Sequence, residues 1–337
     1  MVLSFPFSFG FGFLCVLGSI ISFSSGDWLG VWVGLELNLL GFIPLVVQGV
    51  VGQNIESSIK YFIVQALGSG FILLGGLAGA SLSGVYFGMA SFSFWFFLCV
   101  FGIFLKLGLA PFHWWVPSVM GGLGWFSCGV LMTWQKLAPF LILCVVGSGF
   151  IGLFVLLGCF SSVLGGVMGV GQVQVRVLMA YSSISHWGWV VVLVGFSLMG
   201  AIFYYSLYVF ITLFLFYFLG REGIWRSNDV SGFGGLVIML GFLSLGGLPP
   251  FTGFLPKWAG LQIVSSLSLS IVVLFLVLGA VLSLYYYLGF LFVFFVGSNR
   301  FYNLFASSSS FLVVGFGVLF LFAGFPFYEV FYYCLDF

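Results

Sequence analysis

The sequence is built from apolar runs that are long enough to cross a lipid bilayer. A hydrocarbon core about 30 Å thick requires roughly 20 apolar residues per helix. Runs of this length, separated by polar or Gly/Ser-containing segments, lie at 4–24, 28–50, 57–80, 88–120, 122–146, 148–169, 174–196, 198–220, 232–266, 270–297 and 309–333. The sequence therefore predicts an all-α fold, a polytopic membrane bundle of about eleven transmembrane helices.

The composition excludes several other classes of protein. Only 4% of the 337 residues are charged and 63% are hydrophobic, whereas soluble domains carry about 25% charged residues. We therefore expect a single transmembrane domain over residues 1–337. The net charge of +1 and the lack of basic clusters argue against nucleic-acid binding. The six cysteines have no metal-ligand spacing, and the N-terminus has no basic leader, so we expect neither a metal site nor a cleaved targeting peptide.

Two of the apolar runs, 88–120 and 232–266, are too long for one straight crossing. Both contain a similar interruption: the first has Gly108-Leu-Ala-Pro-Phe followed by Pro117, and the second has Gly247-Leu-Pro-Pro-Phe followed by Pro256. Glycine and proline at these positions predict two half-helices joined within the membrane. Interrupted helices in corresponding halves are typical of transporters built from repeats, with the ion path at the breaks.

The placement of charged residues predicts the orientation. With eleven crossings, the N-terminus and the loops at 51–57, 170–176, 220–231 and 298–308 share one face, which carries Lys60, Arg176, Arg221, Arg226 and Arg300. The opposite face has only the acidic Asp27, Glu329 and Asp336. Positive charge is retained on the cytoplasmic or matrix side of membranes. We therefore expect the N-terminus on that side and the C-terminus on the other.

A small set of ionisable residues lies inside the predicted spans: Glu36, Lys106, Lys136, His186 and Lys257. A charged side chain at mid-bilayer costs about 2.5–3.5 kcal/mol on insertion scales, so their presence indicates a function. The alternative is structural: Glu36 and one lysine form an ion pair, while other lysines, Lys257 foremost, extend to the interface.

The chemistry of these residues suits proton movement. Loss of water destabilises the charged forms of lysine and glutamate, so a Glu36–Lys106 pair could act as a switch, with Lys136 as the next station. His186 could bridge because imidazole both donates and accepts protons; equally, it could be a buried histidine bonded to serine or backbone. We expect a structural or surface role for His113.

Six segments together resemble the subunit 2 family of mitochondrial NADH:ubiquinone oxidoreductase (complex I). They cover most of the region from about residue 28 to 260, and lie at 32–38, 56–66, 106–117, 133–139, 180–189 and 245–258. The segments around Lys136 and Lys257 are more similar to this subunit than to its antiporter-like siblings. The chain resembles the shortened animal form, which lacks three N-terminal helices of the bacterial form.

The resemblance implies a proton-pumping subunit with two inverted five-helix repeats, about 4–146 and 148–297, followed by a helix at about 309–333. It implies that Glu36 and Lys106 form the switch pair, that Lys136 is the central relay and that His186 connects the halves. Lys257 is implied to lie on the exit side.

The resemblance also implies the setting of the chain. It implies that the chain itself carries no cofactor, because other subunits use NADH, FMN, iron–sulfur clusters and ubiquinone. The partners would be other membrane-arm subunits and lipid, including cardiolipin, and the location the mitochondrial inner membrane, with the N-terminus in the matrix and the C-terminus in the intermembrane space. Two alternatives stay open: a subunit of a multi-subunit cation/proton antiporter, or a structural membrane scaffold with vestigial charges.

Overall fold

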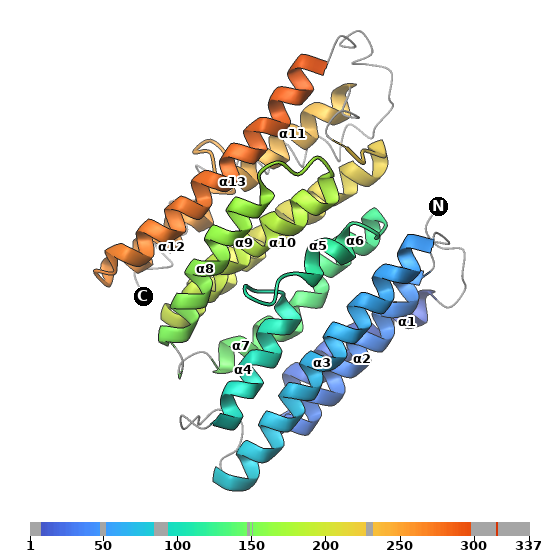
Figure 1. Cartoon of the computed structure of the whole chain (residues 1–337), viewed down its shortest axis with the longest axis vertical. Coiled ribbons are helices and arrows are strands. Elements are labelled where there is room, and N and C mark those ends of the chain that lie inside the picture. The colour runs from blue at the N-terminus through green and yellow to red at the C-terminus, as the bar shows by residue number, and fades with distance from the viewer. Residues whose placement is uncertain are drawn as a thin grey trace. The chain divides into compact units, whose positions relative to one another are not determined.

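The computed structural model describes residues 8–47, 52–83, 94–146, 149, 151–226, 232–297 and 315, and this part of the chain is helical almost throughout. Its elements, labelled in Figure 1, are α1 (Ser8–Ser24), α2 (Trp28–Val47), α3 (Gly52–Ser83), α4 (Phe94–Leu107), α5 (Trp115–Met120), α6 (Trp125–Met132), α7 (Trp134–Val146), α8 (Ile151–Gly169), α9 (Val175–Phe196), α10 (Leu198–Glu222), α11 (Gly232–Gly246), α12 (Phe254–Ser266) and α13 (Ser270–Gly297).

The predicted membrane character is confirmed. In the described residues, seven segments are long and apolar enough to cross a membrane, and shorter apolar helices accompany them. Helices lie in each of the first ten predicted spans. The eleventh span, 309–333, lies outside the described residues except for Gly315, which is helical.

Both predicted interruptions are confirmed. α4 ends at Leu107 and α5 begins at Trp115, while α11 ends at Gly246 and α12 begins at Phe254. Each first half-helix is terminated by a glycine in the left-handed region, with φ of +72° at Gly108 and +81° at Gly247. Glycine adopts this conformation without the steric penalty of a Cβ, which explains why the breaks fall at these residues.

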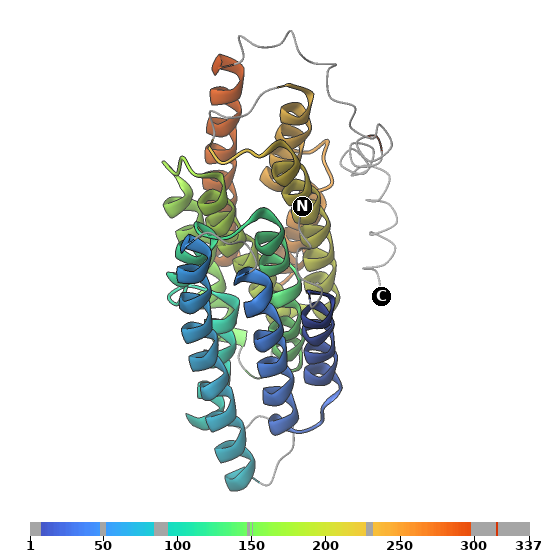
Figure 2. The same cartoon turned by 90° about the vertical axis from the view of Figure 1, so that its right-hand side faces the viewer.

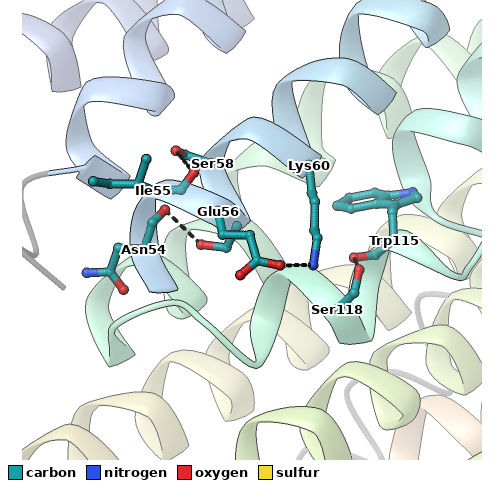
Figure 3. Close-up of polar contacts among 8 residues, drawn as sticks. Asn54, Ile55, Glu56, Ser58, Lys60, Trp115 and Ser118 are labelled. Carbon is teal, nitrogen blue, oxygen red and sulfur yellow. Dashed lines mark hydrogen bonds and ion pairs between the residues drawn. The ribbon is translucent and has the colours of Figure 1, made fainter. Parts of the chain in front are cut away.

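One boundary differs from the prediction, because α3 begins at Gly52 rather than near residue 57. The segment predicted as a loop is the first turn and a half of the helix. Glu56 and Lys60 lie one turn apart on it, and Lys60 Nζ donates to Glu56 Oε1 at 2.6 Å (Figure 3). Pairs at this spacing stabilise helices by a few tenths of a kcal/mol, which favours the extension. Both side chains are exposed.

A third discontinuity, at Thr133, was not predicted. It separates α6 from α7 within the apolar segment Trp125–Val146. The Thr133 hydroxyl donates to the Gly129 carbonyl at 2.7 Å, and Pro139 lies in the second turn of α7 without an amide to donate. Threonine bonding to its own helix and proline both bend helices. As a result, Lys136 lies in the first turn of α7.

The chain divides into two compact units, Met1–Leu157 and Gly158–Phe337, with the boundary inside α8. In the first unit, α1, α2 and α3 run alongside one another, and α3 also packs against α4 (Figures 1 and 2). In the second unit, α9 is the central helix: it contacts α10, α12 and α13, and nearly all of its side chains are buried. The proposed repeat boundaries, 4–146 and 148–297, stay a prediction.

Two of the loops predicted to share a face are in contact. Gln174 and Arg226 form an antiparallel bridge, in which the Val175 amide donates to the Trp225 carbonyl at 3.2 Å. The Arg176 guanidinium lies 4.3 Å from the centre of the Trp225 ring. The bridge holds the start of α9 and the end of α10 together, as expected for two loops on one side of a membrane.

Candidate functional site

The first group of predicted site residues lies where α2, α3 and α4 meet. Glu36, on α2, is half-buried, and its carboxylate accepts a hydrogen bond from the Ser69 hydroxyl of α3. Lys106 is in the last turn of α4 and only 4% exposed. Its aliphatic stem packs on α3 at Gly68, where a Cβ would lie 3.0 Å from Lys106 Cγ.

The break after α4 explains how Lys106 is held. A helix end leaves backbone carbonyls without intrahelical partners. Here the Trp115 indole donates to the Leu105 carbonyl at 3.0 Å, and Gln65 Nε2 donates to the Lys106 carbonyl at 3.3 Å. Side chains of α3 and α5 therefore satisfy the broken end of α4, and this fixes the backbone from which the lysine projects.

Lys136 lies deeper in the first unit, with 2% of its side chain exposed. The residue before it, Gln135, is anchored on both sides: its Nε2 donates to Asn38 Oδ1 at 2.9 Å, and its Oε1 accepts from the Tyr61 hydroxyl at 3.2 Å. Because Asn38 follows Glu36 by two residues, this buried bridge ties the helix that carries Glu36 to the helix that carries Lys136.

One face of α3 contacts Glu36, Lys106 and the residue next to Lys136. Tyr61, Gln65, Gly68 and Ser69 are spaced as neighbours on one side of a helix. They contact, in that order, the residue beside Lys136, the Lys106 carbonyl, the Lys106 stem and the Glu36 carboxylate. Sequence reasoning missed this face. Its signal was polar residues at helical spacing within an otherwise apolar span.

The second unit holds His186 and Lys257. His186 is 5% exposed on α9, and its Nδ1 lies 2.8 Å from the Tyr204 hydroxyl of α10. The ring of Tyr208, one turn further along α10, is 5.4 Å from the imidazole. The sequence left two roles open for His186, a proton-bridging residue or a buried histidine bonded to serine or backbone. The hydrogen bond found is to a tyrosine. Tyr204 carries no signal in the sequence that marks it as a site residue.

Lys257, in the first turn of α12, is 7% exposed, so its side chain is buried within the chain. Its Nζ donates to the carbonyls of Leu245 and Gly246 at 3.0 and 2.8 Å. These are the last carbonyls of α11, the end of a helix that favours a cation. The stem passes over Gly247, where a Cβ would lie 2.8 Å from Lys257 Cδ. Lys257 therefore joins the two half-helices across the break.

The second unit holds further buried polar groups. Ser182, Ser183 and Ser185 of α9 are buried, as are the hydroxyls of Tyr286 and Tyr287 of α13. Tyr287 also reaches the end of α11, where a Cβ on Gly246 would lie 3.6 Å from its ring. His186 Nε2 and the two tyrosine hydroxyls have no hydrogen-bond partner within the described part of the chain. Each of these groups can accept or donate a hydrogen bond.

His113 is placed differently from one of its predicted roles. It is buried within the first break, with its ring stacked on Trp114 at 4.8 Å between centres. A surface role is therefore wrong, and the structural role is the one that the burial favours. Among the described residues, no group of three or more His, Cys, Asp or Glu side chains is arranged to hold a metal ion.

Comparison with known proteins decides the family. The profile described as NADH:quinone oxidoreductase/Mrp antiporter, transmembrane, matches residues 25–283. NADH-ubiquinone oxidoreductase chain 2 of Lumbricus terrestris is 35% identical over 281 residues, 81% of this chain and 82% of that protein. The same subunit of Branchiostoma lanceolatum is 38% identical over 294 residues, 82% and 83% of the two chains. The chain belongs to the NADH-ubiquinone oxidoreductase chain 2 family.

Solved structures share the fold of this family. A chain of respiratory complex I from Thermus thermophilus matches with a TM-score of 0.81 and 27% identity over 94% of this chain and 77% of that one. A chain of an archaeal membrane-bound sulfane sulfur reductase matches with a TM-score of 0.84 and 17% identity, over 95% and 73%. A chain of the Mrp complex from Dietzia matches with a TM-score of 0.77 and 19% identity, over 89% and 64%. The last two show the fold alone.

Proposed function

We propose that the chain is a proton-translocating subunit in the membrane arm of NADH:ubiquinone oxidoreductase. In this proposal, Glu36, Lys106, Lys136, His186 and Lys257 relay protons, driven by electron transfer from NADH to ubiquinone in other subunits. The observation that carries it is the burial of three lysines, each at most 7% exposed, in helices of an apolar chain. Such residues are expensive to keep in a membrane and mark ion pathways.

The arrangement suits a relay in each unit. Glu36 can stabilise the charged form of Lys106 when it is near, and the lysine can release a proton when the carboxylate moves or is neutralised. Lys136 is the next station, and His186 with Tyr204 receives protons on the way to Lys257. Moving one charge against the membrane potential costs about 2.3 kcal/mol per 100 mV, which rearranged buried ion pairs can supply.

The setting follows from the same proposal. Other membrane-arm subunits are the partners, together with inner-membrane lipid including cardiolipin, and no nucleic acid is bound. NADH, FMN, iron–sulfur clusters and ubiquinone act in other subunits, so this chain holds no cofactor. The N-terminus faces the matrix and the C-terminus the intermembrane space of mitochondria. The bridge between the loops at Gln174 and Arg226 supports the placement of these two loops on one face, the face with the arginines.

Two alternatives are separable by experiment. A subunit of a cation/proton antiporter is supported by the profile that includes Mrp antiporters and by the fold shared with the Mrp complex. A structural scaffold would need the charges for assembly alone. Purification of the tagged chain from membranes is expected to bring down flavin, iron–sulfur centres and NADH:ubiquinone activity. A preparation with none of these would favour the antiporter.

Replacing Glu36 with glutamine tests the relay directly. Glutamine keeps the shape and a hydrogen bond with Ser69 but cannot ionise. We expect proton translocation by the purified complex in liposomes to slow by on the order of 100-fold, while NADH oxidation by a soluble acceptor is unchanged. The matched control is Glu56→Gln, an exposed carboxylate on α3 (Figure 3). Wild-type translocation in Glu36→Gln would contradict the proposal.

Replacing Tyr204 with phenylalanine tests the relay in the second unit. The change removes the partner of His186 Nδ1 and keeps the ring that stacks on Trp189 at 6.2 Å. We expect translocation to slow roughly fivefold, as for the loss of one neutral hydrogen bond, with normal assembly. Tyr205→Phe is the control, because the adjacent Tyr205 ring packs on Trp187 instead. Equal slowing in both variants would remove Tyr204 from the relay.

A further inference from the structure

Three serines of α3 donate a hydrogen bond to the carbonyl three residues before them. The distances are 2.9 Å from Ser57 to Asn54, 2.7 Å from Ser58 to Ile55 and 2.9 Å from Ser69 to Ala66. Figure 3 shows the Ser58 bond at the start of the helix. Ser69 differs from the other two because its hydroxyl also lies against a second acceptor, the carboxylate of Glu36.

A serine hydroxyl has one proton to donate and two lone pairs to accept with. Ser69 can therefore donate fully to only one of its two acceptors at a time. When Glu36 is ionised, the bond to the carboxylate is charge-assisted and the stronger of the two. When Glu36 is protonated, its carboxyl O–H can donate a hydrogen bond to Ser69 Oγ. The Ser69 hydroxyl then donates its own hydrogen bond to the Ala66 carbonyl. Both protonation states are satisfied by rotation of one hydroxyl.

The same turn of α3 also contacts the partner of Glu36. Lys106 packs at Gly68, the residue next to Ser69, so one turn of α3 contacts both the Glu36 carboxylate and the stem of Lys106. No described residue of α1 or α7 brings a second carboxylate to this group; the ionisable side chains on these two helices are Cys15, Lys136 and Cys144. Ser69 is thus placed to hold the carboxylate in both states of the pair.

We propose that Ser69 is a positioning residue for Glu36, whose hydroxyl changes acceptor as the carboxylate gains and loses its proton. This inference rests on the proposed function, because it assigns Ser69 a part in the switch between Glu36 and Lys106. It predicts that the hydroxyl is needed for proton transfer but not for the fold, since a helix of this length keeps its backbone bonds without it.

The test compares Ser69→Ala, Ser69→Thr and Ser58→Ala in the purified complex in liposomes. We expect Ser69→Ala to slow proton translocation about tenfold, the loss of one hydrogen bond to a charged group. Ser69→Thr, which restores a hydroxyl, is expected to recover most of the rate; where threonine prevents assembly, Ser69→Cys is expected to recover part of it. Ser58→Ala, which removes a bond of the same kind from the same helix, is expected to match wild type.

Combination with Glu36→Gln separates this inference from the proposed function. In the Glu36→Gln background, Ser69→Ala is expected to add no further loss, because the two residues act together. Wild-type translocation in Glu36→Gln would overturn the proposed function. Two results would overturn only the role of Ser69. The first is slow translocation in Glu36→Gln together with translocation at the wild-type rate in Ser69→Ala. The second is equal slowing of translocation in Ser69→Ala and Ser58→Ala.

Discussion

Proton translocation is expected to slow by on the order of 100-fold when Lys136 is replaced by alanine, because the variant lacks the central group that accepts and releases a proton. The lysine is among the most fully buried large side chains in the described part of the chain. Proton movement into liposomes, measured alongside NADH oxidation by ubiquinone and by a soluble acceptor, reports the effect.

The effect on stability should be small, which keeps the result interpretable. Truncating a large buried side chain costs about 2–5 kcal/mol, but the variant no longer buries a charge that costs about 2.5–3.5 kcal/mol. The bridge from Gln135 to Asn38 and Tyr61 stays in place to hold α7. Lys60→Ala is the control, since Lys60 is an exposed lysine of the same unit (Figure 3). Coupling equal to wild type in Lys136→Ala would discard the relay role.

Assembly, rather than transport, is expected to fail when Gly188 is replaced by valine. A Cβ at Gly188 on α9 would lie 2.6 Å from the Gly158 carbonyl oxygen and 2.6 Å from the Ser162 amide nitrogen of α8. Both are backbone atoms, which cannot rotate away. Overpacking usually costs about 1–3 kcal/mol, and a contact between helix backbones is expected to reach the upper end or beyond.

The amount of assembled complex in membranes, measured on native gels, is the appropriate readout. We expect it to fall severely, because α9 is the centre of the second unit and small residues let membrane helices approach closely. Gly152→Val is the matched control on α8, where a Cβ meets nothing within 4 Å. Normal assembly of Gly188→Val would show that α8 and α9 do not require this close contact.

Much of the fold could be predicted because a bilayer restricts the choices of the chain. Hydrocarbon thickness sets helix length, so the first ten predicted spans each contain a helix. The two helix breaks could be predicted for the same reason. An apolar run longer than the bilayer thickness must be interrupted, and glycine and proline indicated the positions of the interruptions. The start of α3 was misplaced because Glu56 resembles a loop residue until its pairing with Lys60 is known.

The candidate site, too, could be predicted only in part from the sequence. The sequence by itself determined which ionisable residues lie in apolar spans, because a charged residue within an apolar run can be recognised without knowing how the helix is rotated. Only the tertiary structure decided what they contact: Ser69 lies 33 residues from Glu36 and Gln135 lies 97 residues from Asn38. Such contacts depend on how each helix is rotated and where it is kinked, as at Thr133. Those angles are set by packing between helices, which no single segment encodes.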